Sequence, residues 1–105
     1  MGNDLIGKLL AASEGFLVPL RMRDGFDEDA FSRLCEALRK CQEEWRTQDW
    51  IPKRAVSILV DLFSLTLGCV DSYTGATAER VRRAAYDLDI LVTASVAQAE
   101  NDGGN

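Results

Sequence analysis

The 105-residue chain contains no histidine. Histidine is the commonest general base at neutral pH and a frequent metal ligand, so its absence excludes Ser–His and Cys–His nucleophiles and imidazole metal sites. Carboxylate, lysine or tyrosine chemistry stays open, but the chain has no glycine-rich phosphate loop and no carboxylate pairs with di-iron spacing. We therefore expect a protein that is not an enzyme and that binds no cofactor or metal.

Cysteine is scarce as well, with three residues at uneven spacing and no C-x-x-C pair. Such a set is not the framework of a disulfide-stabilised secreted domain, so we expect Cys35, Cys41 and Cys69 to be buried reduced thiols. The N-terminus lacks the basic region of a secretory signal. Both observations favour a cytoplasmic protein.

Long uninterrupted hydrophobic runs are also missing. The most apolar stretch, 55–70, is short for a membrane span and contains Asp61. The chain carries 17 acidic and 12 basic residues, a net charge of −5, and an acidic surface repels nucleic-acid phosphates. We therefore expect neither a membrane nor a nucleic acid as a partner.

What the sequence does contain is material for one helical domain. Of its residues 47% are hydrophobic, which suffices for a single core at this length. Apolar residues recur at helical spacing in four segments, 4–17, 27–46, 52–73 and 77–99, with Asp27 and Thr77 as N-caps. We expect residues 1–99 to form one helical domain and the polar residues 100–105 to form a disordered tail.

The four segments differ in ways that predict how they pack. Pro19 argues against a helix beyond Val18, so the first helix should be short. The third is apolar on nearly every side, which predicts a central helix enclosed by the others. One polar line remains on it: Arg54, Ser57, Asp61, Ser64, Gly68 and Asp71. The predicted fold is all-α, an antiparallel four-helix bundle with a short first helix and an apolar central third helix.

Two local signals mark the ends of the predicted helices. Phe26 precedes the cap Asp27 and Phe31 follows it, and this spacing fits a hydrophobic staple. Gly75 suits a left-handed residue in the turn before the last helix. These signals set the expected boundaries of the second and fourth helices.

A cluster of acidic residues is the first candidate for partner binding. Asp24, Asp27, Glu28 and Asp29 fall within six residues of one another. Helix capping and compensation of the helix dipole account for the last three of them. The alternative is a docking patch for a basic protein, because opposite charges accelerate association.

Trp50, Asp61 and Ser64 are the other candidates for partner contacts. Trp50 lies in a predicted loop, where it either covers one end of the core or contacts a partner. Asp61 and Ser64 belong to the polar line of the third helix. That line is either the solvent-exposed edge of the helix or a partner contact. A third interpretation, the least favoured, is that Asp61 pairs with an arginine and acts as a catalytic acid.

Arg80, Arg82 and Arg83 form a basic trio beside Tyr86. Arginines next to an aromatic ring can bind phosphate or RNA. A solvated helix face gives the same pattern, and the net negative charge of the chain favours that interpretation.

The segment 65–91 resembles a known family of small proteins. It contains Leu-Thr-Leu-Gly at 65–68, a short polar turn, and Ala84-Ala85-Tyr86 on the following helix. It is similar to the all-helical immunity proteins paired with NAD-degrading toxins of bacterial type VI secretion. The resemblance implies a protein that binds a cognate toxin and covers its active site. The turn, Tyr73-Thr74-Gly75, is less acidic than in that group, so no binding residue is carried over from it.

The leading hypothesis is thus a non-catalytic helical binding protein, an immunity protein that sterically inhibits a bacterial toxin. Its expected contact residues are Asp24, Asp27, Glu28, Trp50, Asp61 and Ser64. The alternative is a self-associating structural, adaptor or chaperone-like bundle, and a homodimer is compatible with either hypothesis.

Overall fold

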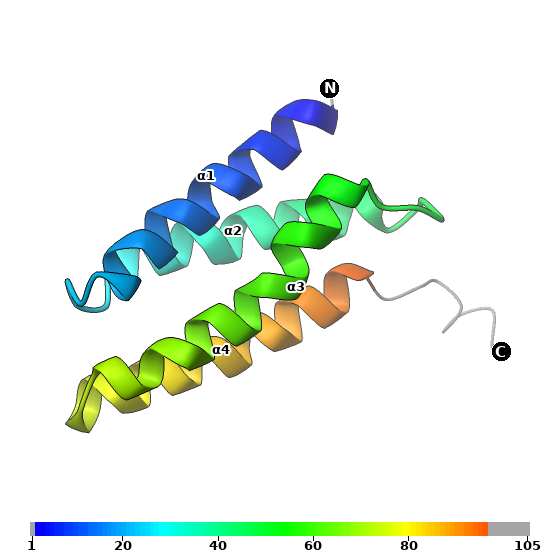
Figure 1. The fold of residues 1–105 in the computed structure, drawn as a ribbon. Helices are drawn as coiled ribbons and strands as arrows, with labels where there is room; N and C mark the ends of the chain where they lie inside the picture. The colour runs from blue at the N-terminus through cyan, green and yellow to red at the C-terminus, as the bar shows by residue number, and fades with distance from the viewer. Residues whose placement is uncertain (1, 97–105) are drawn as a thin grey trace, which may run out of the picture.

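The computed structural model describes residues 2–96, which fold into four α-helices and one short 3₁₀-helix (Figure 1). They are α1 (Gly2–Arg21), α2 (Glu28–Trp45), α3 (Lys53–Gly68), η1 (Cys69–Ser72) and α4 (Gly75–Val96). These described residues contain no strand, so the predicted all-α fold is confirmed. The predicted helix end at 97–99 and the predicted tail at 100–105 lie outside the described residues.

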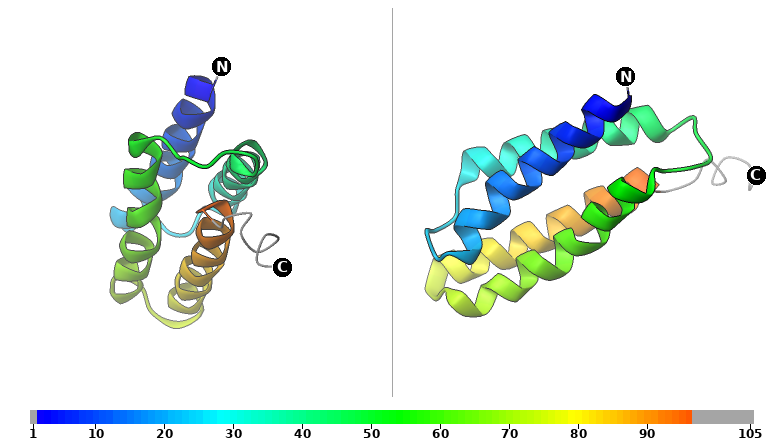
Figure 2. Two further views of the ribbon diagram at one scale, coloured as in Figure 1. Left: turned by 90° about the vertical axis from the view of Figure 1, so that its right-hand side faces the viewer. Right: turned by 45° about the horizontal axis from the view of Figure 1, so that its top comes forward.

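The helices form two hairpins that pack side by side (Figure 2). α1 packs on α2 and α3 packs on α4, and the hairpins meet where α2 contacts α4 and α1 contacts α3. The α1–α2 loop and the α3–α4 turn lie at one end of the molecule, and the α2–α3 loop lies at the other. Because the molecule is 44 Å long, residues at opposite ends cannot share a small binding site.

Helix α1 is 20 residues long, so the predicted short first helix is wrong. Pro19 lies inside its last turn, where the proline nitrogen cannot donate to the carbonyl of Gly15. Burial of Phe16, Leu17 and Leu20 around this position offsets the loss. Each such side chain contributes about 1.5–3 kcal/mol when fully buried, and together they outweigh the cost of one proline.

Helix α2 begins as the sequence predicts. Asp27 is its N-cap, and the Asp27 carboxylate accepts a hydrogen bond from the Ala30 N–H at 3.0 Å. The rings of Phe26 and Phe31 lie 5.5 Å apart, which confirms the predicted staple. One face of the helix is buried throughout: Ala30, Phe31, Leu34, Cys35, Ala37, Leu38, Cys41 and Trp45.

Helix α3 is buried along one line only, at Ala55, Leu59, Leu62 and Thr66. It contacts α1 on one flank and α4 on the other, and it does not reach α2. Val60 is 64% exposed. The expectation of a central helix enclosed by the others is therefore wrong, because apolar content on all sides does not reveal which sides have a neighbour. The predicted polar line of α3 is exposed along its length.

The α3–α4 turn contains the predicted left-handed glycine, since Gly75 has φ +59°. Helix α4 nevertheless begins at Gly75, and the Thr74 carbonyl accepts its first helical hydrogen bond from the Ala78 N–H. Thr77 thus lies in the first turn and is not the N-cap. Tyr73 ties this turn to the other hairpin, because its hydroxyl donates to the Leu20 carbonyl (2.8 Å) and accepts from a loop N–H.

Within the described residues, one helical stretch, Lys53–Ser72, is long and apolar enough to cross a membrane by length and composition. Of its most apolar window, 33% is buried inside the protein. Core helices reach the same apolarity as membrane spans, so length and composition alone do not distinguish them. The expectation of no membrane partner stays a prediction.

Candidate functional site

All four residues of the acidic cluster are exposed, and two of them also have structural roles. Asp27 caps α2, and Glu28 forms an ion pair with α4. Asp24 and Asp29 are exposed, on the α1–α2 loop and in the first turn of α2. Two of the three predicted acidic contact residues therefore have structural roles, and the docking patch stays a prediction.

Glu28 and Arg80 join the two hairpins. Both oxygens of the Glu28 carboxylate accept hydrogen bonds from the Arg80 guanidinium, at 2.7 and 2.9 Å. The guanidinium also lies over the rings of Phe26 (4.4 Å) and Phe31 (5.1 Å). The hydrogen bond from Arg80 lowers the pKa of the Glu28 carboxyl and raises the pKa of Arg80. This pair positions α4 against α2.

Trp50 lies apart from every other predicted contact residue. It is 65% exposed in the α2–α3 loop, and its carbonyl accepts a hydrogen bond from the Gln48 side chain at 3.1 Å. That loop is at the end of the molecule opposite Asp24 (Figure 1). The predicted contact residues are therefore not brought together on one surface.

Asp61 and Ser64 are exposed on α3, as expected for its polar line. A catalytic role for Asp61 would require an arginine beside it. Arg80 is instead bound to Glu28, and Arg82 is bound to Glu79 at 2.9 Å. Within the described chain, Asp61 is recorded in no ion pair, so the structure supplies no acid–arginine dyad.

A groove between α1 and α3 lies beside two of the predicted contact residues. It consists of two cavities of about 320 Å³ each, which share Arg21 and Leu65 and so form one continuous depression. Its α1 side is formed mainly by Leu10, Glu14, Leu17, Val18 and Arg21, and its α3 side by Ser57, Ile58, Asp61, Ser64 and Leu65. Two predicted contact residues, Asp61 and Ser64, thus line this α1–α3 groove.

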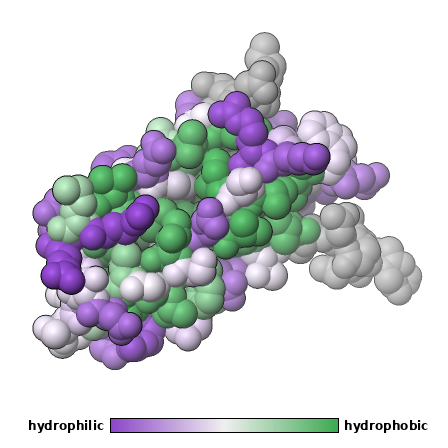
Figure 3. Space-filling model, in the orientation of Figure 1, coloured by the Kyte–Doolittle hydropathy of each residue, from purple (hydrophilic) through white to green (hydrophobic). Residues whose placement is uncertain are grey.

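The groove is apolar with charges at its edges. Val18 is 51% exposed and Leu65 is 37% exposed, and both line the same cavity. Figure 3 looks onto the α1–α3 side and shows hydrophobic side chains along its middle with hydrophilic ones around them. Glu14 and Asp61 supply a negative charge on each side, and Arg21 supplies a positive charge where the cavities meet.

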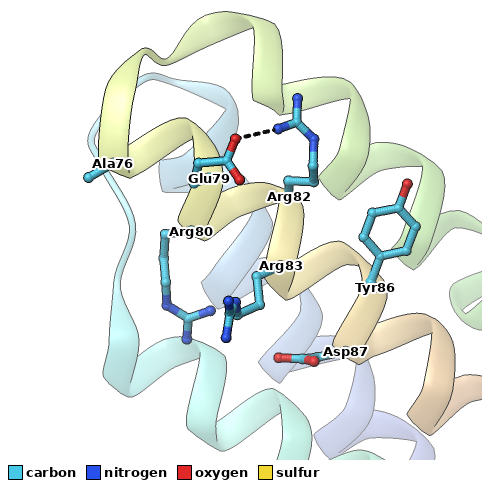
Figure 4. Close-up of a pocket in the computed structure, with 7 residues that line it drawn as sticks. All are labelled: Ala76, Glu79, Arg80, Arg82, Arg83, Tyr86 and Asp87. Atoms are coloured by element: carbon cyan, nitrogen blue, oxygen red, sulfur yellow. Dashed lines mark hydrogen bonds and ion pairs between the residues drawn. The ribbon is translucent and has the colours of Figure 1, made fainter.

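Another cavity, of about 470 Å³, lies over the basic trio of α4 (Figure 4). Two of its three arginines are paired, because Arg80 is bound to Glu28 and Arg82 to Glu79, while Arg83 is in no ion pair among the described residues. Asp87 also lines it. This arrangement is compatible with the solvated helix face considered from the sequence.

The three cysteines are free and buried, which confirms the prediction of buried thiols. Burial raises the pKa of Cys41 to about 11, and it also raises the pKa of Cys35 and Cys69. Protonated thiols are poor nucleophiles and poor metal ligands. No group of three metal-ligating side chains occurs among residues 2–96.

Sequence reasoning did not find the α1 side of the groove. The predicted first helix ended at residue 17, so its continuation through Pro19 was not considered. The spacing of Leu10, Leu17 and Val18 places them on one side of an uninterrupted helix. That second apolar stripe was the signal that could have indicated the groove.

Comparison of the chain with protein-family models, with curated proteins and with solved structures finds no match. The similarity of residues 65–91 to immunity proteins therefore stays a hypothesis drawn from the sequence.

Proposed function

We propose that this chain is a non-catalytic binding protein that holds a helical segment of a protein partner in the α1–α3 groove. The observation that carries the proposal is the continuous apolar groove, with Val18 and Leu65 exposed across it. A depression between two helices is a common receptor for an amphipathic helix, whose apolar residues enter at i, i+3 and i+7 positions.

The charges around the groove favour one kind of segment. Glu14 and Asp61 flank the middle of the groove, and Arg21 lies where the two cavities meet. A complementary helix carries a lysine or arginine near its centre and an acidic residue close to one end. The net charge of −5 also accelerates encounter with a basic partner.

Inhibition of a bacterial toxin is the biological role we propose for this binding. The support for it is the resemblance of residues 65–91 to small helical immunity proteins. An inhibitor of this class needs a surface that keeps substrate out of the active site of the toxin, and it does not have to catalyse a reaction itself. The alternative role is that of an adaptor or chaperone-like bundle that uses the same groove.

Capture from the source cells tests the groove. We expect the tagged chain to retain one dominant partner, and Ile58→Asp to lose most of it because a carboxylate would enter the apolar groove. Ile90→Asp is the matched control, since Ile90 is exposed on α4 away from the groove and the variant should retain the partner. Equal capture by Ile58→Asp would contradict the groove as the site.

Co-expression tests the role. The captured partner should arrest growth when it is produced alone, and the wild-type chain should restore growth while Ile58→Asp should not. A partner that is harmless when produced alone would contradict toxin inhibition and favour the adaptor role.

A further inference from the structure

The α1–α3 groove runs between two helices that point in the same direction. Both α1 and α3 begin toward the end of the molecule that holds the α2–α3 loop, and both end where the α1–α2 loop and the α3–α4 turn lie (Figure 1). The dipole of a helix is positive at its N-terminus and negative at its C-terminus. The two dipoles therefore add along the groove, so that one end of the groove is positive and the other is negative.

The charged side chains of α3 strengthen this polarity. An acidic residue in the first turn or a basic residue in the last turn would offset the dipole, and α3 has neither. It begins instead with Lys53 and Arg54, and Asp71 follows it in η1. Arg54 is exposed, forms no ion pair among residues 2–96, and lies three residues before Ser57, on the polar line that borders the groove.

Arg21 supplies the one positive charge at the other end of the groove. It lies in the last turn of α1, is exposed, and forms no ion pair within the part of the chain that the structure describes. An acidic residue of a bound helix can pair with it. In the first turn of that helix the acid is also favoured by the dipole of its own helix, and in the last turn it is disfavoured.

We infer that the partner segment lies antiparallel to α1 and α3, with its N-terminal turn beside Arg21 and its C-terminal turn toward Arg54. This inference rests on the proposed function, because it takes the groove to hold a helix. Arg21 follows Glu14 by seven residues, which is about two helical turns. The bound segment therefore carries an acidic residue in its first turn and a lysine or arginine about two turns later, between Glu14 and Asp61.

Site-specific cross-linking to the captured partner determines the direction. Ser57 and Ser64 are exposed on the groove side of α3, about 10.5 Å apart along the helix, and each is replaced in a separate variant by the photoreactive p-benzoylphenylalanine. Mass spectrometry then identifies the partner residue that each variant attaches. The residue attached from position 64 should precede the residue attached from position 57 by about seven places in the partner sequence.

Charge reversal at Arg54 tests the same direction without cross-linking. Arg54→Glu places a negative charge near the C-terminal turn of the segment, so the Kd of the recombinant partner should rise about two- to fivefold. Arg39→Glu, on the exposed side of α2, is the matched control because it changes the net charge by the same amount. A segment bound in the opposite direction would present its N-terminal turn to position 54 and would bind Arg54→Glu more tightly than the control.

The outcomes separate the direction from the groove itself. The opposite order of cross-links, or an Arg54→Glu variant that binds as tightly as Arg39→Glu or more tightly, would overturn the direction and leave the groove as the binding site. A partner that Ile58→Asp retains and that neither photoreactive variant attaches would overturn the proposed function and this inference together. So would a chain that captures no partner.

Discussion

Thr66 has the least favourable environment of any described polar side chain. It is fully buried, and its Oγ1 has no hydrogen-bond partner. A buried hydroxyl that gives up water without a replacement costs free energy, and valine has nearly the same shape without the hydroxyl. Thr66→Val should therefore raise the free energy of unfolding by about 1 kcal/mol, measured by urea denaturation.

Thr66→Ser is the control for that prediction. It keeps the hydroxyl and removes a methyl group from the core, so it should destabilise the protein. A loss of stability in Thr66→Val would show that the hydroxyl has a partner in solution.

The Glu28–Arg80 pair predicts a defined pH dependence. The pKa of Glu28 is lowered below its ordinary 4.5, so the folded state favours the carboxylate. The resulting stabilisation is complete above that ordinary value, and it is lost as the pH falls through the lowered pKa. The effect is small because Glu28 is largely exposed. On acidification, the urea midpoint of the wild type should fall further than that of Glu28→Gln.

The wild type and Glu28→Gln differ in a single carboxyl group, so any difference between their pH dependences comes from Glu28. Parallel declines in the two midpoints would mean that the pair does not persist in solution.

At the scale of the helices, two glycines should respond in opposite ways to the same substitution. Gly15 lies inside α1, and an added Cβ there meets nothing within 4 Å. Gly15→Ala should therefore stabilise the protein by about 0.5–1 kcal/mol. Gly75 has φ +59°, a conformation that costs an alanine about 1–2 kcal/mol, so Gly75→Ala should destabilise it. Thermal unfolding of both variants checks the signs.

A destabilised Gly15→Ala would indicate that α1 does not continue through Pro19 in solution. An unaffected Gly75→Ala would indicate that the α3–α4 turn adopts another conformation.

Some features of the helices could be predicted from the sequence and others could not. The existence of the helices and the Asp27 cap follow from patterns a few residues long, and these were predictable. The true length of α1 was not predictable. The energetic cost of Pro19 can be seen in the local sequence, but the burial that offsets it depends on contacts with other helices. The position of α3 was not predictable either, since apolar residues on its exposed side, such as Val60, look the same in sequence as those on its buried line.

At the scale of the whole molecule, Tyr73 connects the two hairpins. Its hydroxyl donates to the Leu20 carbonyl (2.8 Å) and accepts from the Gly25 N–H (3.1 Å). Tyr73→Phe leaves both backbone groups without this partner, and it should lower the free energy of unfolding by about 1–2 kcal/mol. Urea denaturation measures the loss, and circular dichroism should show unchanged helix content.

Contacts between residues far apart in the sequence explain why the candidate site was only partly predictable. Asp61 and Ser64 were recognised as an exposed edge because α3 is a single continuous helix. The groove they border needs α1 beside α3, and that pairing joins residues more than 40 positions apart. Glu28 was assigned to partner binding for the same reason, because its bond to Arg80 spans 52 positions and leaves no local pattern.

The order of synthesis gives the apolar surface of α3 another consequence. The ribosome releases α3 before α4, which is the neighbour on one of its flanks. Until α4 has emerged, the nascent chain presents a helix as apolar as a membrane span, and of the two helices made before it only α1 packs on it in the described fold. Nascent hydrophobic surface of this kind is what chaperones bind and what aggregates when they are saturated. The yield of folded protein should therefore depend on how soon α4 follows α3 out of the ribosome.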